Sequence, residues 1–160
     1  MNTSTTINEI KPVKKHATAV VLHLYYTELF SEVQSYLDHL DDEFDLFLSL
    51  TEDQSAFAKN IRTKYPDASI LIVPNHGRDL APFLEFLKII VPLGYETLLK
   101  VHTKKTLHRE DGTTWRKDVL EKLLGSKAQV SSIQKAFASD GSLAMLGPQD
   151  HVIDLSLIHI

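Results

Sequence analysis

Two patterns of apolar and polar residues alternate along the chain. Short, nearly continuous apolar runs rich in β-branched residues are typical of strands buried on both faces, and they cover residues 17–26, 44–50, 69–74 and 97–103. Between and after these runs, apolar residues recur at helical spacing, which predicts helices over 28–40, from a cap at 51–53 to about 65, and over 80–91, 115–124 and 127–138.

A fifth, short strand is predicted at 143–146, before Gly147 and Pro148. Strands that alternate with helices of about a dozen residues indicate the α/β class. We therefore expect a Rossmann-like, mostly parallel sheet flanked by helices.

Polar side chains gather where the predicted strands end. The carboxyl ends of parallel strands share one edge of the sheet, and ligands of open α/β folds bind just beyond that edge. Strand by strand, the candidates are His23 and Tyr25, then Asn75, Gly77, Arg78 and Asp79, then Lys100, His102, Lys104 and Lys105. We expect them to converge on one crevice, with ordinary loop polarity as the alternative.

Positive charge is concentrated around the end of the fourth predicted strand. Four cations follow one another there without an intervening acid: Lys100, Lys104, Lys105 and Arg109. A phosphate or diphosphate suits such a patch, together with the planar guanidinium of Arg78. Gly77 lets the backbone approach a ligand closely, and the helix that starts behind it favours an anion. A solvated basic loop and ordinary turn geometry are the alternatives.

Three further side chains have both a chemical and a structural interpretation. Asp79 is a candidate general base, or a partner of Arg78 or of a sugar hydroxyl, and equally a helix N-cap. His102 is a phosphate donor or a group that titrates near neutrality, and equally a structural histidine. Arg116 is expected to hold a phosphate beside a stacking Trp115, with core packing of that indole as the alternative.

Composition excludes several classes of function. A net charge of −4 argues against general nucleic-acid binding. The chain has no cysteine and no metal-ligand spacing of histidines, so we expect neither disulfides nor a metal. A Walker P-loop and a G-x-G-x-x-G string are both missing, which disfavours an ATPase or a dinucleotide enzyme. Without a signal sequence or an apolar run of ~18 residues, a soluble, cytoplasmic protein is expected.

Three segments are expected along the chain. Residues 1–16 form a polar tail, 17–154 a Rossmann-like domain, and 155–160 a non-native tail. The last segment, LSLIHI, has the codon reading CTG TCT CTT ATA CAC ATC, which matches a transposase adapter sequence. We therefore expect the natural chain to continue beyond about Asp154 and the domain to be truncated at its C-terminus.

Two strings, NHGRDLAPFL at 75–84 and KVHTKKT at 100–106, resemble the hallmark segments of the rhamnan synthesis protein F family. Members take part in building rhamnose-containing cell-wall polysaccharides and O-antigens in bacteria. Supporting segments lie in the same order at 23–29, 44–51, 115–126 and 143–148, so the resemblance covers about 17–148.

The resemblance implies a glycosyltransferase whose fold is similar to the nucleotide-sugar domain of GT-A enzymes. The implied reaction is transfer of rhamnose from dTDP-rhamnose, or of a sugar from another nucleotide-sugar. The Asp-x-Asp metal motif of that fold is missing, and its place holds His102, Lys104 and Lys105. Cationic side chains would replace the divalent ion, so no metal cofactor is expected.

The implied roles follow from side-chain chemistry. The leaving nucleoside diphosphate would be stabilised by Lys104, Lys105 and Arg78. The sugar or the acceptor would be oriented by Asn75, Asp79 and His102. The nucleobase would stack near Tyr25 or Tyr26. Asp79 is the candidate for the base that deprotonates the acceptor hydroxyl.

The expected partners are a nucleotide-sugar donor and a polysaccharide or lipid-linked acceptor, without nucleic acid. A peripheral association with the cytoplasmic membrane face through the rest of the full-length protein is left open. The alternative function is a non-catalytic module that binds a nucleotide-sugar or phosphoglycan within a polysaccharide-synthesis protein. A phosphate-ester hydrolase is disfavoured, because no Asp-x-Asp nucleophile pair ends a strand.

Overall fold

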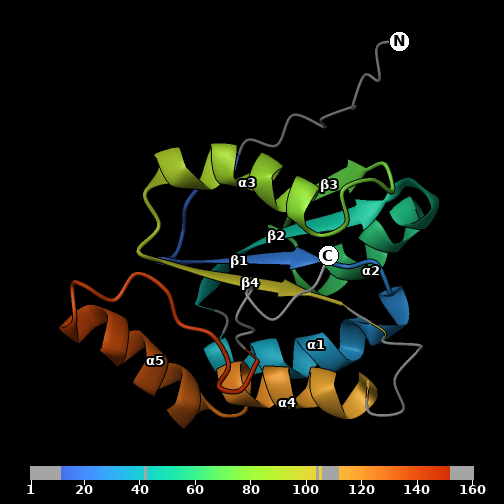
Figure 1. The fold of residues 1–160 in the computed structure, drawn as a ribbon. Helices are drawn as coiled ribbons and strands as arrows, with labels where there is room; N and C mark the ends of the chain where they lie inside the picture. Colours follow the sequence, from blue (N-terminus) through green and yellow to red (C-terminus); the bar gives the residue numbers. More distant parts are fainter. Residues whose placement is uncertain (1–11, 42, 104, 106–111, 152–160) are drawn as a thin grey trace, which may run out of the picture. The chain divides into compact units, whose positions relative to one another are not determined.

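In the part of the chain that the structure describes, four parallel strands form one sheet (Figure 1). A computed structural model describes residues 12–41, 43–103, 105 and 112–151. In order across the sheet, the strands are β3 (Ser69–Val73), β2 (Phe44–Thr51), β1 (Thr18–His23) and β4 (Thr97–His102). The predicted α/β, Rossmann-like fold class is confirmed.

The strand order reverses next to β1. From β1 the chain adds β2 and then β3 on one side, and β4 pairs with the opposite side of β1. The reversal therefore lies between β1 and β4. In open α/β sheets, ligands bind outside the carboxyl ends of the strands at such a switch point.

The chain divides into two compact units. The first unit comprises Met1–Ser31 and Glu43–Lys104 and contains the sheet. The second comprises Glu32–Asp42 and Lys105–Ile160, and its regular elements are helices.

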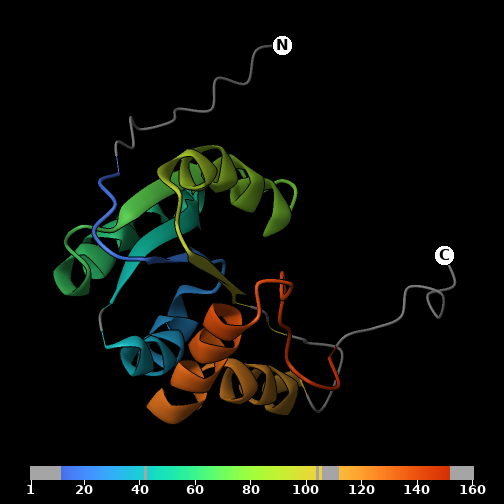
Figure 2. The ribbon, with the colours of Figure 1, turned by 90° about the vertical axis from the view of Figure 1, so that its left-hand side faces the viewer.

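One face of the sheet is covered by α3 (Leu80–Leu93), as Figure 2 shows. Strand side chains alternate between faces, so residues two apart point the same way. On this face Val21 and Phe47 pack against Phe86 and Ile90 of α3, and the rings of Phe47 and Phe86 lie 5.6 Å apart, edge to face. Burying such a side chain contributes about 1.5–3 kcal/mol, so this cluster fixes α3 on the sheet.

The opposite face is also apolar. It presents the alternate strand residues Val20, Leu22, Leu46 and Leu48, all of them buried. The ring of Tyr65, just after α2 (Ala58–Lys64), lies 5.9 Å from that of Phe44, the first residue of β2. Because both faces are buried, the strands read as continuous apolar runs, which is the pattern that revealed them.

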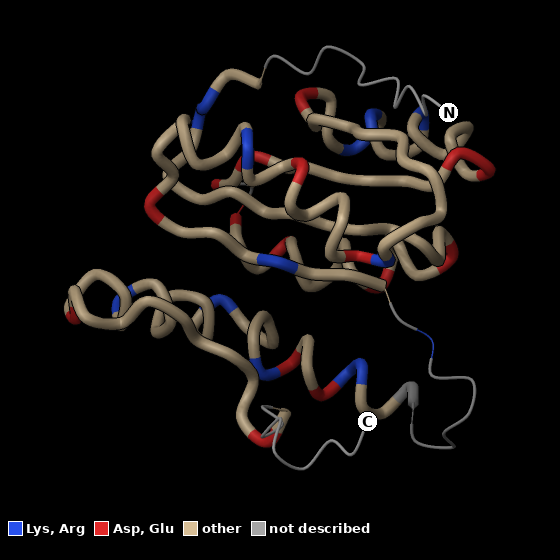
Figure 3. Tube along the Cα trace, turned by 45° about the horizontal axis from the view of Figure 1, so that its top comes forward, with Lys and Arg blue, Asp and Glu red and all other residues tan. Residues whose placement is uncertain are grey.

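Charged residues are rare in the strands, as the tan stretches of Figure 3 show. Apart from histidine, the four strands contain only Asp45 in β2 and Lys100 in β4. At the amino end of the sheet, Asp45 accepts hydrogen bonds from the Tyr95 hydroxyl at 2.7 Å and the Lys15 N–H at 2.8 Å. A charge inside a sheet needs a partner. Lys100, toward the other end of the sheet, must therefore be paired as well.

The helices of the second unit bury apolar side chains and are also joined by polar contacts. It contains most of α1 (Phe30–Leu37), the 3₁₀ turn η2 (Asp38–Leu40), α4 (Gly112–Leu124) and α5 (Lys127–Ser139), and α4 contacts α5. Arg116 Nε lies 2.9 Å from Glu32 Oε2, and the Tyr36 hydroxyl donates to Glu121 Oε1 at 3.1 Å. Ser126 caps α5 by accepting from the Gln129 N–H.

Several predicted boundaries were wrong. The helix predicted over 28–40 is split into η1 (Thr27–Leu29), α1 and η2, and the one starting near 51–53 begins as a 3₁₀ turn, η3 (Glu52–Phe57). Both η1 and η3 lead directly into an α-helix, and 3₁₀ turns are frequent at helix N-termini. Helix α3 continues past Pro92 and ends at Gly94, whose φ is +67°.

The fifth strand predicted at 143–146 is absent, since these residues have no regular structure. The run is short, and Met145 is 85% exposed, so pairing would bury too little apolar surface to offset the ordering of the backbone. The predictions for residues 1–11 and for the adapter-like tail at 155–160 lie outside the described residues.

Removing the central ring of the α3 face should weaken the fold. Phe86 is fully buried, so Phe86→Ala is expected to lower the free energy of unfolding by about 3–5 kcal/mol in urea titrations. Leu84→Ala, on the same helix but 50% exposed, is the control and should cost less than about 1 kcal/mol. Equal losses in the two variants would contradict this packing.

Candidate functional site

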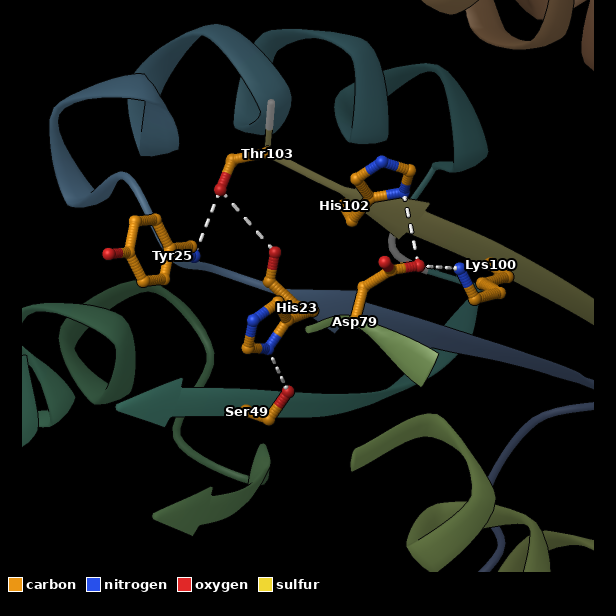
Figure 4. Close-up of polar contacts among 7 residues, drawn as sticks. All are labelled: His23, Tyr25, Ser49, Asp79, Lys100, His102 and Thr103. Atoms are coloured by element: carbon orange, nitrogen blue, oxygen red, sulfur yellow. Dashed lines mark hydrogen bonds and ion pairs between the residues drawn. The ribbon is translucent and has the colours of Figure 1, made fainter. Parts of the chain in front are cut away.

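The alternation of strand side chains brings four polar groups to the α3 face. His23 of β1 is in register with Ser49 of β2 and with His102 of β4, and Lys100 lies two residues before His102. These residues follow the apolar positions of the same face: His23 comes two after Val21. The packing of the core therefore points all four groups to the same side, at the switch point (Figure 4).

Asp79 meets this group from the loop before α3. It occupies the N-cap position, yet its side chain makes no capping hydrogen bond. Its carboxylate instead forms an ion pair with Lys100 Nζ, and the same oxygen lies 3.6 Å from His102 Nδ1. Of the two interpretations of Asp79, the geometry therefore favours the one in which the carboxylate belongs to the cluster.

Opposing effects set the ionisation of Asp79. Burial is the largest effect and raises its pKa, but the hydrogen bond from Lys100 and the charges of His102 and Lys100 together outweigh it. The net pKa is lowered, so the carboxylate is ionised at neutral pH.

His23 is the buried, neutral member of the cluster. Burial lowers its pKa, the charges of His102 and Lys100 lower it further, and Asp79 acts in the opposite direction. Its Nδ1 shares a 2.8 Å hydrogen bond with the Ser49 hydroxyl. A neutral imidazole both donates and accepts, so His23 adds hydrogen bonding to the site without adding charge.

The loop that carries Asp79 has an uncommon backbone. Gly77 and Arg78 both adopt the left-handed region, with φ of +74° and +53°. A Cβ on Gly77 would lie 2.4 Å from the Cβ of Ala81, so only glycine fits there. A left-handed arginine is strained, and such strain persists where surrounding structure or function maintains it. Arg78 is exposed beside Asp79.

Thr103 fastens the ends of β1 and β4 together. Its hydroxyl accepts from the N–H groups of Tyr25 at 2.9 Å and Tyr26 at 3.0 Å, and it lies 3.4 Å from the His23 carbonyl oxygen. The Thr103 N–H also donates to that carbonyl, at 3.0 Å. The loop after β3 joins this edge through Asn75, whose Nδ2 donates to the Tyr25 hydroxyl at 3.4 Å.

The structure thus brings together four of the predicted site residues, namely Asp79, His102, Lys100 and His23. Four more line the adjoining loops of the same unit: Tyr25, Asn75, Gly77 and Arg78. Lys104 lies outside the described residues. Lys105 and Arg116 belong to the second unit, where Arg116 is paired with Glu32. Phosphate binding by these three residues stays a prediction.

Two residues of the site were missed. Ser49 lies on the same face of β2 as Phe47 and is paired with His23 across the sheet. The pairing of two strands cannot be read from the sequence of one strand alone. The role of Thr103 cannot be read from the sequence either, because its hydrogen-bond partners are backbone groups of a segment about 80 residues away.

In the described part of the chain, no three His, Asp or Glu side chains are grouped so that they could hold a metal ion. A metal-free site stays a prediction. Nor does any helix in that part have the length and apolar character needed to cross a membrane.

Fold and site together define a Rossmann-like α/β protein with a charged cluster at its switch point. The chain belongs to the family described as rhamnan synthesis protein F, whose family model matches residues 2–153, so the resemblance inferred from the sequence is confirmed.

Curated relatives include two proteins named uncharacterized protein WxcX, from Xanthomonas campestris pv. campestris strains B100 and ATCC 33913. Each is 30% identical over 143 residues, which make up 88% of this chain and 20% of the relative. The chain therefore spans about one fifth of their length. No solved structure matches it.

The backbone of the Asp79 loop should tolerate no side chain at residue 77. Gly77→Ala introduces a clash and a strained φ, and we expect it to lower the free energy of unfolding by about 1–3 kcal/mol. Gly141→Ala is the control, because nothing lies within 4 Å of its added Cβ. If urea titrations show equal stability for the two variants, the described loop geometry is wrong.

His23 should make stability depend on pH. Its pKa in the folded chain is below the ordinary value of 6.5, so the unfolded chain takes up a proton first. This contribution to stability is complete above 6.5 and is lost as the pH falls through the folded value. Between about pH 7.5 and about pH 5, the unfolding free energy of His23→Gln should therefore fall less steeply than that of wild type.

The control for this experiment is His76→Gln, which removes an exposed histidine. It should keep the wild-type pH slope. A wild-type slope in His23→Gln as well would show that His23 is not the group responsible.

Proposed function

We propose that this chain is the nucleotide-sugar-binding part of a glycosyltransferase that acts in the synthesis of a cell-surface polysaccharide, with rhamnosyl transfer as the favoured reaction. The observation that carries the proposal is the cluster of Lys100, His102 and Asp79 at the switch point of a sheet in this family. A nucleotide-sugar needs a cationic contact for its diphosphate and oriented polar groups for its sugar.

The residues divide between these tasks. Lys100 is half-buried on β4 at the switch point, so its ammonium group lies close to where the diphosphate would bind. Arg78 is exposed beside Asp79 and would add a bidentate contact, together with the charges of Lys104 and Lys105. His23, Asn75 and His102 offer hydrogen bonds to the sugar or the acceptor.

Asp79 is the candidate base, but its ion pair with Lys100 weakens it. A general base works best when its pKa lies near the working pH, and the pKa of Asp79 is lowered. This favours a second candidate function, a non-catalytic module that binds a nucleotide-sugar or phosphoglycan within a larger protein. The length of the relatives is compatible with either function, since the rest of such a protein could supply other catalytic groups.

The proposed partners are a nucleotide-sugar such as dTDP-rhamnose and a polysaccharide or lipid-linked acceptor. We place the reaction in the cytoplasm, where activated sugars are made, with any membrane association coming from the rest of the full-length protein. No metal cofactor is proposed, because cationic side chains would neutralise the leaving diphosphate.

The binding role of Lys100 is tested by calorimetry with dTDP and UDP. Lys100→Met should weaken binding about 10- to 150-fold, since a charge-assisted contact contributes about 1.5–3 kcal/mol. Lys88→Met removes an exposed lysine of α3 and should bind like wild type. Equal affinities of Lys100→Met and wild type would contradict the proposed diphosphate site.

Transfer itself separates the two candidate functions. The full-length protein is incubated with labelled dTDP-rhamnose, other nucleotide-sugars and a lipid-linked acceptor. Label in the acceptor, reduced in Lys100→Met, supports the glycosyltransferase. Binding without transfer or hydrolysis of any donor supports the module.

A further inference from the structure

The ion pair between Asp79 and Lys100 gives each charge a partner while leaving both within reach of a ligand. The lysine side chain is 32% exposed and the carboxylate 27%. Half-buried charges have lost part of their hydration, so each depends on an opposite charge nearby. Anything that takes one partner must leave the other to find a substitute.

A diphosphate is a strong competitor for the lysine. It carries more negative charge than one carboxylate and offers several acceptor oxygens. The lysine side chain is also adaptable, with an ammonium group at the end of a flexible four-carbon stem. Its ammonium also lies 5.5 Å from the centre of the Phe83 ring, so Asp79 is not the only group that stabilises the cation.

We propose that donor binding exchanges this ion pair: Lys100 leaves Asp79 for the diphosphate, and the released Asp79 carboxylate becomes the base that accepts the proton of the acceptor hydroxyl. The inference rests on the proposed function in taking a nucleoside diphosphate as the ligand. It resolves the conflict that a paired Asp79 is too weak a base, because the pairing ends when the donor is bound.

The surroundings of Asp79 suit this exchange. His102 Nδ1 lies 3.6 Å from the carboxylate oxygen that faces Lys100, so the carboxylate keeps one partner when Lys100 leaves. The backbone of Asp79 is held between the left-handed Gly77–Arg78 turn and the first turn of α3. The carboxylate thus stays in place while its partner changes.

The chemical step balances on these groups. The acceptor hydroxyl gives its proton to Asp79, and its oxygen forms a bond to the anomeric carbon of the donor. The bond from that carbon to the diphosphate oxygen breaks, and its electron pair leaves with the nucleoside diphosphate. Lys100 stabilises the negative charge that develops there.

Exchange predicts that removing the carboxylate improves ligand binding. In Asp79→Asn, Lys100 has no acidic competitor, so UDP and inorganic pyrophosphate should bind about three- to tenfold more tightly than to wild type in calorimetry. In a Lys100→Met background, Asp79→Asn should change the affinity by less than about twofold. The control, Glu85→Gln, frees Lys88 from a 2.7 Å ion pair on α3 and should leave the affinity unchanged.

The outcomes separate this inference from the proposed function. Unchanged or weaker binding by Asp79→Asn, in a protein that binds UDP, overturns the exchange and leaves the nucleotide site standing. Tighter pyrophosphate binding without any UDP binding supports the exchange and contradicts the nucleotide-sugar function. Binding of neither probe by wild type or Asp79→Asn overturns both.

Discussion

The burial of β1 on both faces is the constraint on which the rest of the structure depends. All six residues of this strand are buried, and it pairs with β2 on one side and β4 on the other. Because strand side chains alternate, the phase that packs Val21 against α3 also directs His23, and through the register His102, to the same face. A one-residue shift in register would turn the residues that pack on α3, and the polar cluster with them, to the opposite face of the sheet. The same register therefore specifies both the core and the site.

The charged residues of the site are paired within the same arrangement. Apart from histidine, Lys100 is one of two charged residues in the strands. It forms an ion pair with Asp79 at the start of the helix that covers its face of the sheet. This pairing joins the start of α3 to β4. In the proposed reaction the same pair supplies the cation for the leaving diphosphate and the carboxylate for the acceptor proton. Lys100 and His102 together lower the pKa of Asp79 against the effect of burial.

Much of the fold could be predicted from the sequence because burial on both faces leaves continuous apolar runs. The four strands and the confirmed family follow from such local patterns, and so do Lys100, His102 and Asp79 as members of one edge. The prediction of a fifth strand was wrong because an apolar run alone does not supply a pairing partner. The Asp79–Lys100 pair and the role of Ser49 depend on strand register and on where a helix begins, which no local pattern contains.

The central claim is that the switch point between β1 and β4 binds the diphosphate of an activated sugar. A crystal structure of the chain with dTDP tests it most directly. The account predicts the diphosphate beyond the carboxyl ends of β1 and β4, with a phosphate oxygen about 3 Å from Lys100 Nζ. An ordered nucleotide bound at any other edge of the sheet, with Lys100 still paired to Asp79, would contradict it.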